Sequence, residues 1–367
     1  MRRGAGWRIF PRHKGGEAGL FPFRQVDRRP FAGATDTNQL VRVDMQKRMF
    51  STLAITCVAA MFAGWASAAA VLPLDDDEDD LVPTGKGWGE RSQHSQGKGN
   101  ANGGGQGQGQ GQGSPNVQGA NGISYHGGPV LLGTTNVYYI WYGNWSGNTA
   151  TTILADLANG FSGSPYYNIN TTYYNGSNVH VSNAVALRGS RTVAYPYGTS
   201  LSDSQIRSVV ADAIASGSPT AADPNALYFV LTSADVTASS GFCTQYCGWH
   251  THGTIGGADI KYSFVGNPDR CPSACAAQTT GPNGNAGADG MASIIAHELE
   301  EAVTDPDLNA WYDRRGAENA DKCAWTFGTE STAANGSRYN VTLGTRKYLI
   351  QRNWVNAAGG YCSMQYP

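Results

Sequence analysis

The stretch D-G-M-A-S-I-I-A-H-E-L-E-E-A-V-T-D-P, residues 289–306, decides how the folded part of this chain is interpreted. Its apolar residues recur at helical spacing, which predicts a helix with one apolar face. These residues are Met291, Ile294, Ile295, Leu299, Ala302 and Val303. Asp289 or Ser293 can cap the start of this helix, and Pro306 lies just past its end.

The polar side of the same helix carries an imidazole and several carboxylates. His297, Glu301 and Asp305 are spaced i, i+4 and i+8, so they stack along one side, with Glu298 next to them. Zinc proteases carry H-E-x-x-H on a helix, with the Glu as general base; here Glu301 stands at the second His. A carboxylate can ligate zinc, and a set rich in hard oxygens also suits calcium or manganese. The pattern therefore predicts either a metal site or an acidic helix face.

A metal site needs further ligands from elsewhere in the chain. Glu318 and Asp321 follow the helix at a spacing that permits a role as the downstream acidic ligand that some zinc proteases bring to the metal. His250 and His252 form an H-x-H pair, which on a strand would place both rings on one face. In a hydrolase, the metal would lower the pKa of a bound water, and Glu298 would accept its proton.

Outside this stretch, composition divides the chain into four parts. Residues 45–70 have the charged start, apolar run and A-S-A site of a secretory signal peptide, with an inverted membrane anchor as the alternative. Residues 1–44 are then interpreted as a gene-model extension. Residues 71–122 are acidic and then rich in Gly and Gln, which predicts a disordered linker. The folded domain is expected at 123–367.

Charge and cysteines restrict the class of protein. A net charge of −2 gives no argument for a nucleic-acid partner, and no other apolar run predicts a membrane span in the mature chain. Six cysteines follow the signal, which predicts disulfides in an exported protein. The sequence does not determine the pairing; the short-range choice is Cys243–Cys247, Cys271–Cys275 and Cys323–Cys362, and a zinc site from the two C-x-x-x-C elements is the alternative.

The folded part alternates between strand and helix patterns. Strands are predicted at 136–142, 166–174, 179–187, 227–231, 259–265 and 346–354. Helices are predicted at 149–161 and after Ser202, where Gln205 completes a capping box and Gly217 ends the helix. The order predicts an α/β (α+β) fold, a mixed sheet covered by helices. A strand, a cystine-rich loop, an edge-like strand and the His-Glu helix also resemble a zincin-like arrangement.

Several long motifs resemble the EXORDIUM/phosphate-induced protein 1 family. They are Y-H-G-G-P-V-L (125–131), N-V-Y-Y-I-W-Y-G-N-W (136–145), G-F-C-T-Q-Y-C-G-W-H (241–250), V-G-N-P-D-R-C-P-S-A-C (265–275), P-N-G-N-A-G-A-D-G-M (282–291) and R-K-Y-L-I-Q-R-N-W (346–354). The resemblance implies a secreted, disulfide-bearing protein of the extracellular space or cell wall, and it implies no catalytic residue. With its His-Glu helix, the chain resembles the microbial branch.

Two functions follow as hypotheses. One is a secreted zincin-like metallohydrolase with an extracellular peptide as substrate. The other is a non-catalytic extracellular or wall-associated protein that binds polysaccharide, for which Trp311 and Tyr312 are the candidate aromatic platform.

Overall fold

The computed structural model describes residues 82–86 and 122–367. The expected signal peptide, the 1–44 extension and the rest of the expected linker lie outside the described residues. No helix within 82–86 and 122–367 is long and apolar enough to cross a membrane.

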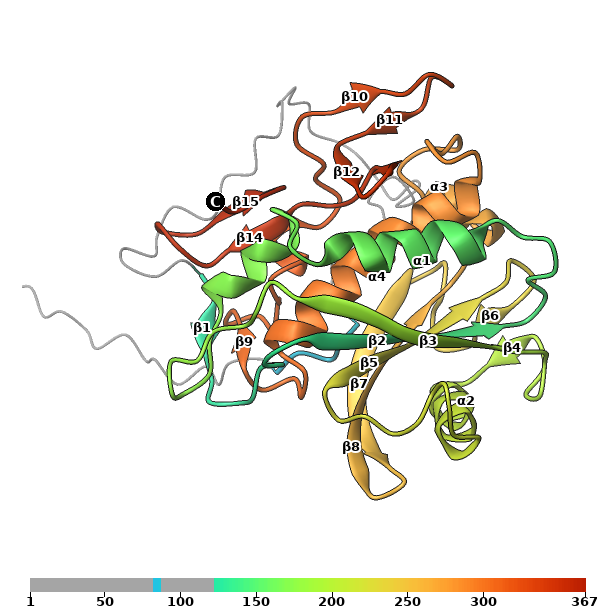
Figure 1. Ribbon diagram of the computed structural model, residues 1–367, viewed down its shortest axis with the longest axis horizontal. Coiled ribbons are helices and arrows are strands. Elements are labelled where there is room, and N and C mark those ends of the chain that lie inside the picture. Colours follow the sequence, from blue (N-terminus) through green and yellow to red (C-terminus); the bar gives the residue numbers. More distant parts are fainter. Residues whose placement is uncertain (1–81, 87–121) are drawn as a thin grey trace, which may run out of the picture. The chain divides into compact units, whose positions relative to one another are not determined.

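A five-stranded mixed sheet lies at the centre of the domain, in the order β3-β2-β5-β8-β7 (Figure 1). Strands β2 (Thr135–Tyr142), β3 (Val185–Val193), β5 (Ala226–Thr232) and β8 (Ala258–Val265) are parallel. Strand β7 (Gly248–Ile255) runs antiparallel to β8 and forms one edge. The buried, β-branched and aromatic run of β5 suits its central place. The mixed α/β sheet is thus confirmed.

Helices cover both faces of this sheet. Figure 1 shows α1 (Ala150–Phe161) and α4 (Ala286–Thr304) on one face and α2 (Asp203–Ala215) on the other. The predicted capping box of α2 is confirmed: the Gln205 backbone N–H donates to Ser202, and the Ser202 backbone N–H donates to the Gln205 side chain. Each helix packs its apolar side on the sheet, giving three layers.

Helix α4 begins earlier than its sequence predicted, and both predicted caps are wrong. Asn285 is the N-cap, and its side-chain oxygen accepts from the Ala288 backbone N–H at 3.1 Å. Asp289 instead accepts from the backbone N–H of Asn283 at 3.0 Å. Nearly every residue of α4 is buried, so its acidic side faces protein rather than solvent.

Three predicted strands differ from the structure, and in two of them side chains form hydrogen bonds with the backbone. Residues 166–174 contain a 3-10 helix, Tyr167–Thr172, whose Thr172 hydroxyl donates to the Ile169 carbonyl. The strand predicted at 179–187 begins only at Val185. The strand predicted at 346–354 splits into β13 (Arg346–Tyr348) and β14 (Asn353–Val355), because the backbone N–H groups of Ile350 and Gln351 donate to the side chains of Asn340 and Ser293.

Short elements complete the domain. They are β1 (Ser124–Tyr125), η2 (Tyr167–Thr172), β4 (Ser200–Leu201), β6 (Thr237–Ala238), η3 (Pro268–Arg270), α3 (Pro272–Cys275), β9 (Trp311–Tyr312), η4 (Asp321–Cys323), β10 (Ser331–Thr332), β11 (Arg338–Tyr339), β12 (Val341–Leu343), β13 (Arg346–Tyr348), β14 (Asn353–Val355) and β15 (Tyr361–Ser363). They pair as β1-β9, β4-β6, β10-β11, β12-β13 and β14-β15.

Three disulfides link the cysteines of the domain. Cys323 and Cys362 pair as predicted, but the two C-x-x-x-C elements are joined to each other, by Cys243–Cys271 and Cys247–Cys275. The short-range pairing is wrong because α3 places Cys271 and Cys275 one helical turn apart, where both side chains point toward the other loop. Since all four sulfur atoms are in disulfides, the alternative zinc site at these cysteines is wrong as well.

Candidate metal centre

Helix α4 places its chemical groups inside the protein. His297, Glu298 and Glu301 are each at most 1 % exposed. The apolar residues that alternate with them pack into the core, so the helix holds the polar groups in fixed directions. Burying three ionisable groups is costly unless they are compensated, and the compensation comes from two other segments.

Strand β7 brings His250 to this helix. The Nδ1 atom of His250 lies 3.4 Å from Oε2 of Glu298 and 3.5 Å from Oε2 of Glu301. Gly248 allows this approach, because a Cβ atom there would lie 2.5 Å from Cγ2 of Ile294 and 2.9 Å from Oε1 of Glu298. Gly248 could not be predicted as part of the site, since a single glycine in a strand carries no signal of what it approaches.

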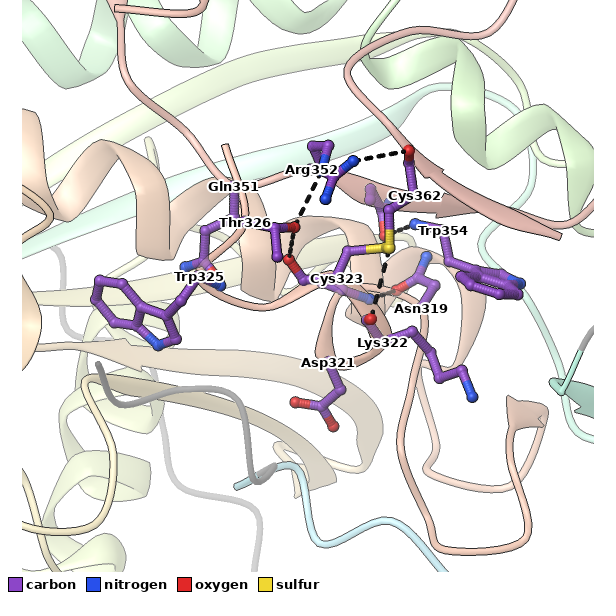
Figure 2. Close-up of a disulfide and its surroundings, with 12 residues drawn as sticks. Asn319, Asp321, Lys322, Cys323, Trp325, Thr326, Gln351, Arg352, Trp354 and Cys362 are labelled. Carbon is purple, nitrogen blue, oxygen red and sulfur yellow. Dashed lines mark hydrogen bonds between the residues drawn. A yellow bond between two sulfur atoms is a disulfide. The ribbon is translucent and has the colours of Figure 1, made fainter. Parts of the chain in front are cut away.

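The segment after α4 closes the other side. Glu318 Oε1 lies 3.5 Å from Nε2 of His250, and Asp321 Oδ1 lies 3.6 Å from Nε2 of His297. Asp321 is the first residue of η4, which the Cys323–Cys362 disulfide links to β15. The Asp321 side chain points away from the sulfur atoms (Figure 2). These residues form what is called here the buried cluster: His250, His297, Glu298, Glu301, Glu318 and Asp321.

Among the described residues, the imidazoles and Glu298 of the buried cluster face its other atoms without forming hydrogen bonds, whereas Glu301 Oε1 and Asp321 Oδ2 accept from the backbone N–H groups of Asp321 and Glu318. Within the part of the chain that the structure describes, neither ring nitrogen of His250 or His297 and neither oxygen of Glu298 has a hydrogen-bond partner. His297 Nε2 nevertheless lies 3.0 Å from Oε1 of Glu301. Buried polar groups are rarely left in this state, so the arrangement calls for something that all of them can bind.

A divalent cation fits the geometry. Two donor atoms about 2.1 Å from a tetrahedral zinc ion are separated by about 3.4 Å, and the N···O distances in the cluster are 3.0–3.6 Å. Two overlapping groups can converge on an ion: His297 with Glu301 and Asp321, and His250 with Glu298 and Glu301. Glu301 belongs to both groups, one oxygen facing each imidazole.

Electrostatics in the cluster follow from burial and mutual proximity. Burial raises the pKa of Glu298 to about 7, despite the nearby imidazoles. Burial also opposes ionisation of Glu301, but the imidazoles, His297 foremost, lower its pKa to about 2. Although burial disfavours charged imidazoles, the carboxylates raise the pKa of His250 and of His297 well above the usual value. Without a cation, the cluster therefore retains protons at neutral pH.

Other candidate residues lie apart from the two groups. One oxygen of Asp305 accepts from the backbone N–H groups of Asn309 and Ala310, which fixes the turn that ends α4. His252 lies 2.9 Å from Asp259 rather than in the cluster. Trp311 is buried and its indole N–H donates to the Tyr174 carbonyl, so it packs in the core and presents no exposed platform.

Comparison with known proteins identifies the family. Residues 123–364 match the model of the phosphate-induced protein 1 conserved region. The chain belongs to the phosphate-induced protein 1 family. It is 33% identical over 280 residues to EXORDIUM-like 3 of Arabidopsis thaliana, covering 66% of this chain and 82% of that protein. It is 28% identical over 221 residues to PHOSPHATE-INDUCED 1 of Nicotiana tabacum, covering 52% of this chain and 67% of that protein.

Membership of this family confirms the resemblance seen in the sequence and assigns no reaction. The match covers every element that contributes to the buried cluster, from β7 to η4. The chemistry of this phosphate-induced protein 1 domain must therefore be argued from its own residues.

Proposed function

We propose that this protein is an exported, zincin-like metallohydrolase that acts on peptides. The observation that carries the proposal is the convergence of buried imidazole nitrogens and carboxylate oxygens, among which both imidazoles and Glu298 have no hydrogen-bond partner within the described residues. Such a set of donors, held on a helix and an adjacent edge strand, suits a catalytic cation better than a solvated acidic face.

The residues divide into holding and proton-transfer roles. His297, Glu301 and Asp321 hold the cation, with His250 and Glu318 on the second side of Glu301. A bound zinc ion would supply Lewis acidity and a water of lowered pKa. Glu298, next to the ligand His297 and with a pKa raised by burial to about 7, accepts a proton at its carboxylate oxygen. Calcium or manganese, which also suit oxygen-rich sites, are the alternatives to zinc.

Strand β7 favours a peptide as substrate. It is the edge of the sheet, it runs antiparallel to β8, and it carries His250 of the buried cluster. An unpaired strand edge binds an extended peptide through backbone hydrogen bonds. A peptide lying there would pass close to the proposed cation. Three disulfides agree with export to an oxidising compartment, outside the cell or in its wall.

A non-catalytic extracellular role is the second candidate, and burial favours it. The Glu298 side chain is 0% exposed, and the side chains of the other five residues of the cluster are at most 3% exposed. A closed site with all ligands from protein is typical of a structural metal. In that case the cation would stabilise the domain, and binding of a wall polysaccharide or another partner would occur elsewhere on the surface.

The change Glu298→Gln separates the two candidates. In a hydrolase it leaves the bound metal in place and lowers peptide hydrolysis by about 10²–10⁴-fold, because the proton acceptor is lost. Metal content by mass spectrometry and cleavage of a peptide library are the two measurements. Glu330→Gln, which alters a partly exposed carboxylate paired with Arg338, is the matched control. Metal without hydrolysis in the unaltered protein supports the structural role, and full hydrolysis by Glu298→Gln refutes the assigned base.

A further inference from the structure

Residues 82–86, with the sequence V-P-T-G-K, lie against the free edge of β7. They belong to the stretch expected to be a linker. The backbone N–H of His250 donates to the Gly85 carbonyl at 3.1 Å, on the side of β7 that no strand occupies in the described sheet. Figure 1 draws this short segment in blue beside the sheet. It contacts the strand at the residue that belongs to the buried cluster.

The fit at Gly85 is close. A Cβ atom at this position would lie 1.8 Å from the His250 carbonyl oxygen and 3.6 Å from Cδ2 of Leu308, and the backbone has a φ of +66°. Both observations require glycine, because any side chain would collide with β7 and few adopt this φ. The backbone of residues 82–86 therefore approaches the backbone of β7 as closely as a bound peptide approaches the edge strand that binds it.

The Lys86 side chain contacts a carboxylate and two aromatic rings, whereas Gly85 contacts β7 through its backbone. The Lys86 Nζ lies 2.6 Å from Oδ2 of Asp203, 5.4 Å from the ring centre of Tyr246 and 5.3 Å from that of Trp249. The pocket is organised independently of Lys86, because the Ser240 hydroxyl bonds both Asp203 and Tyr246. A carboxylate together with two aromatic rings that lie within reach of the same ammonium group favours a cationic side chain.

Each of these contacts is weak by itself. The Lys86 and Asp203 side chains are 30% and 45% exposed, and partly exposed ion pairs and cation–π contacts each contribute little to affinity. A free peptide would bind this surface weakly. The same five residues tethered to the domain bind at a high effective concentration, which makes the covalent segment the favoured occupant.

We propose that the edge of β7 and the Asp203 pocket form a subsite for extended peptides with a glycine followed by a basic residue, and that residues 82–86 occupy this subsite in cis. The proposal deepens the proposed function, since it names the class of peptide presented to the buried cluster. Occupation in cis excludes other peptides, so displacement or removal of the segment opens the subsite.

The test uses the full secreted chain and a fluorescein-labelled V-P-T-G-K peptide with an amidated end. In fluorescence anisotropy, Lys86→Ala is expected to bind this peptide at least about tenfold more tightly than the unaltered protein, because the tethered competitor is weakened. Lys86→Arg keeps the cation and is expected to bind as weakly as the unaltered protein. Val82→Ala, at a residue 61% exposed, is the control within the same segment.

Peptide specificity provides the second half of the test. The matched peptide V-P-T-G-A is expected to bind Lys86→Ala at least about tenfold more weakly than V-P-T-G-K, because it lacks the cation. Equal binding of the two peptides, or equal binding by Lys86→Ala and the unaltered protein, overturns the proposal. Because binding is measured without hydrolysis, the expected ranking combined with no cleavage by any variant would reject the hydrolase and retain the subsite.

Discussion

Replacing His297 by alanine is the most direct perturbation of the candidate metal centre. His297 offers the imidazole that faces Glu301 at 3.0 Å and Asp321 at 3.6 Å. Without it, two buried carboxylates remain, and a divalent cation loses its nitrogen ligand. We expect the His297→Ala protein to lose most of the stabilisation that added zinc gives to the unaltered protein.

The size of this effect follows from linkage. A ligand at about 1,000 times its dissociation constant stabilises the folded state by about 4 kcal/mol. For a domain of this size each 1 kcal/mol raises Tm by about 2–4 °C. The unaltered protein should therefore gain about 8–16 °C on zinc addition, and His297→Ala should gain almost nothing.

The assay is thermal unfolding with chelator and with added zinc, manganese or calcium, together with metal analysis of the purified protein. His180→Ala is the matched control, because His180 is an exposed histidine whose ring contacts the Thr171 carbonyl. The comparison uses the metal-induced shift, since loss of a buried imidazole also destabilises the metal-free state. A full shift in His297→Ala, or no shift with any of the three metals in the unaltered protein, would refute the metal centre.

Further predictions concern packing, the disulfide and pH. Gly248→Ala should lower the free energy of unfolding by about 1–3 kcal/mol in urea titration, because its Cβ would collide with α4, whereas Gly253→Ala has space and should change it little. The double change Cys323→Ser with Cys362→Ser should cost about 2–5 kcal/mol and weaken zinc binding in a competitive chelator titration. Because the folded protein raises the pKa of His250 and of His297, their protonation stabilises the metal-free protein at low pH. This stabilisation is lost as the pH rises through the pKa values of the folded state. Zinc must displace these protons, so its Tm shift should grow from about pH 5.5 to about pH 8; an equal shift at both would contradict this assignment.

Much of the fold could be predicted from periodicity because its elements bury regular apolar patterns. The strand at 136–142, the helix after Ser202 and the long helix at 289–306 all follow such patterns. Strand β7 was not predicted as part of the sheet, because glycines and histidines interrupt its apolar alternation. The strand at 259–265 was consequently expected at the edge, but it is internal β8.

The sequence predicted most residues of the candidate site but not how the surrounding protein buries and positions them. The spacing on one helix indicated His297, Glu298 and Glu301. Glu318 and Asp321 were indicated by their position downstream of that helix. Three-dimensional facts lay outside the reach of the sequence: that the acidic side of α4 is buried, that Asp305 fixes a turn, and that residues 82–86 contact β7. Each depends on contacts between segments far apart in the chain.

The disulfide beside Asp321 would make binding of the proposed cation depend on oxidation of the protein. Cys323 comes two residues after this carboxylate, and its partner Cys362 lies 39 residues further along, in β15. The disulfide can therefore hold the Asp321 segment only after β15 has been made and the two thiols have been oxidised. Loading of the ion would then be a late maturation step. Chains produced in a reducing cytosol should emerge metal-poor even when zinc is abundant, and oxidative refolding should restore their metal content.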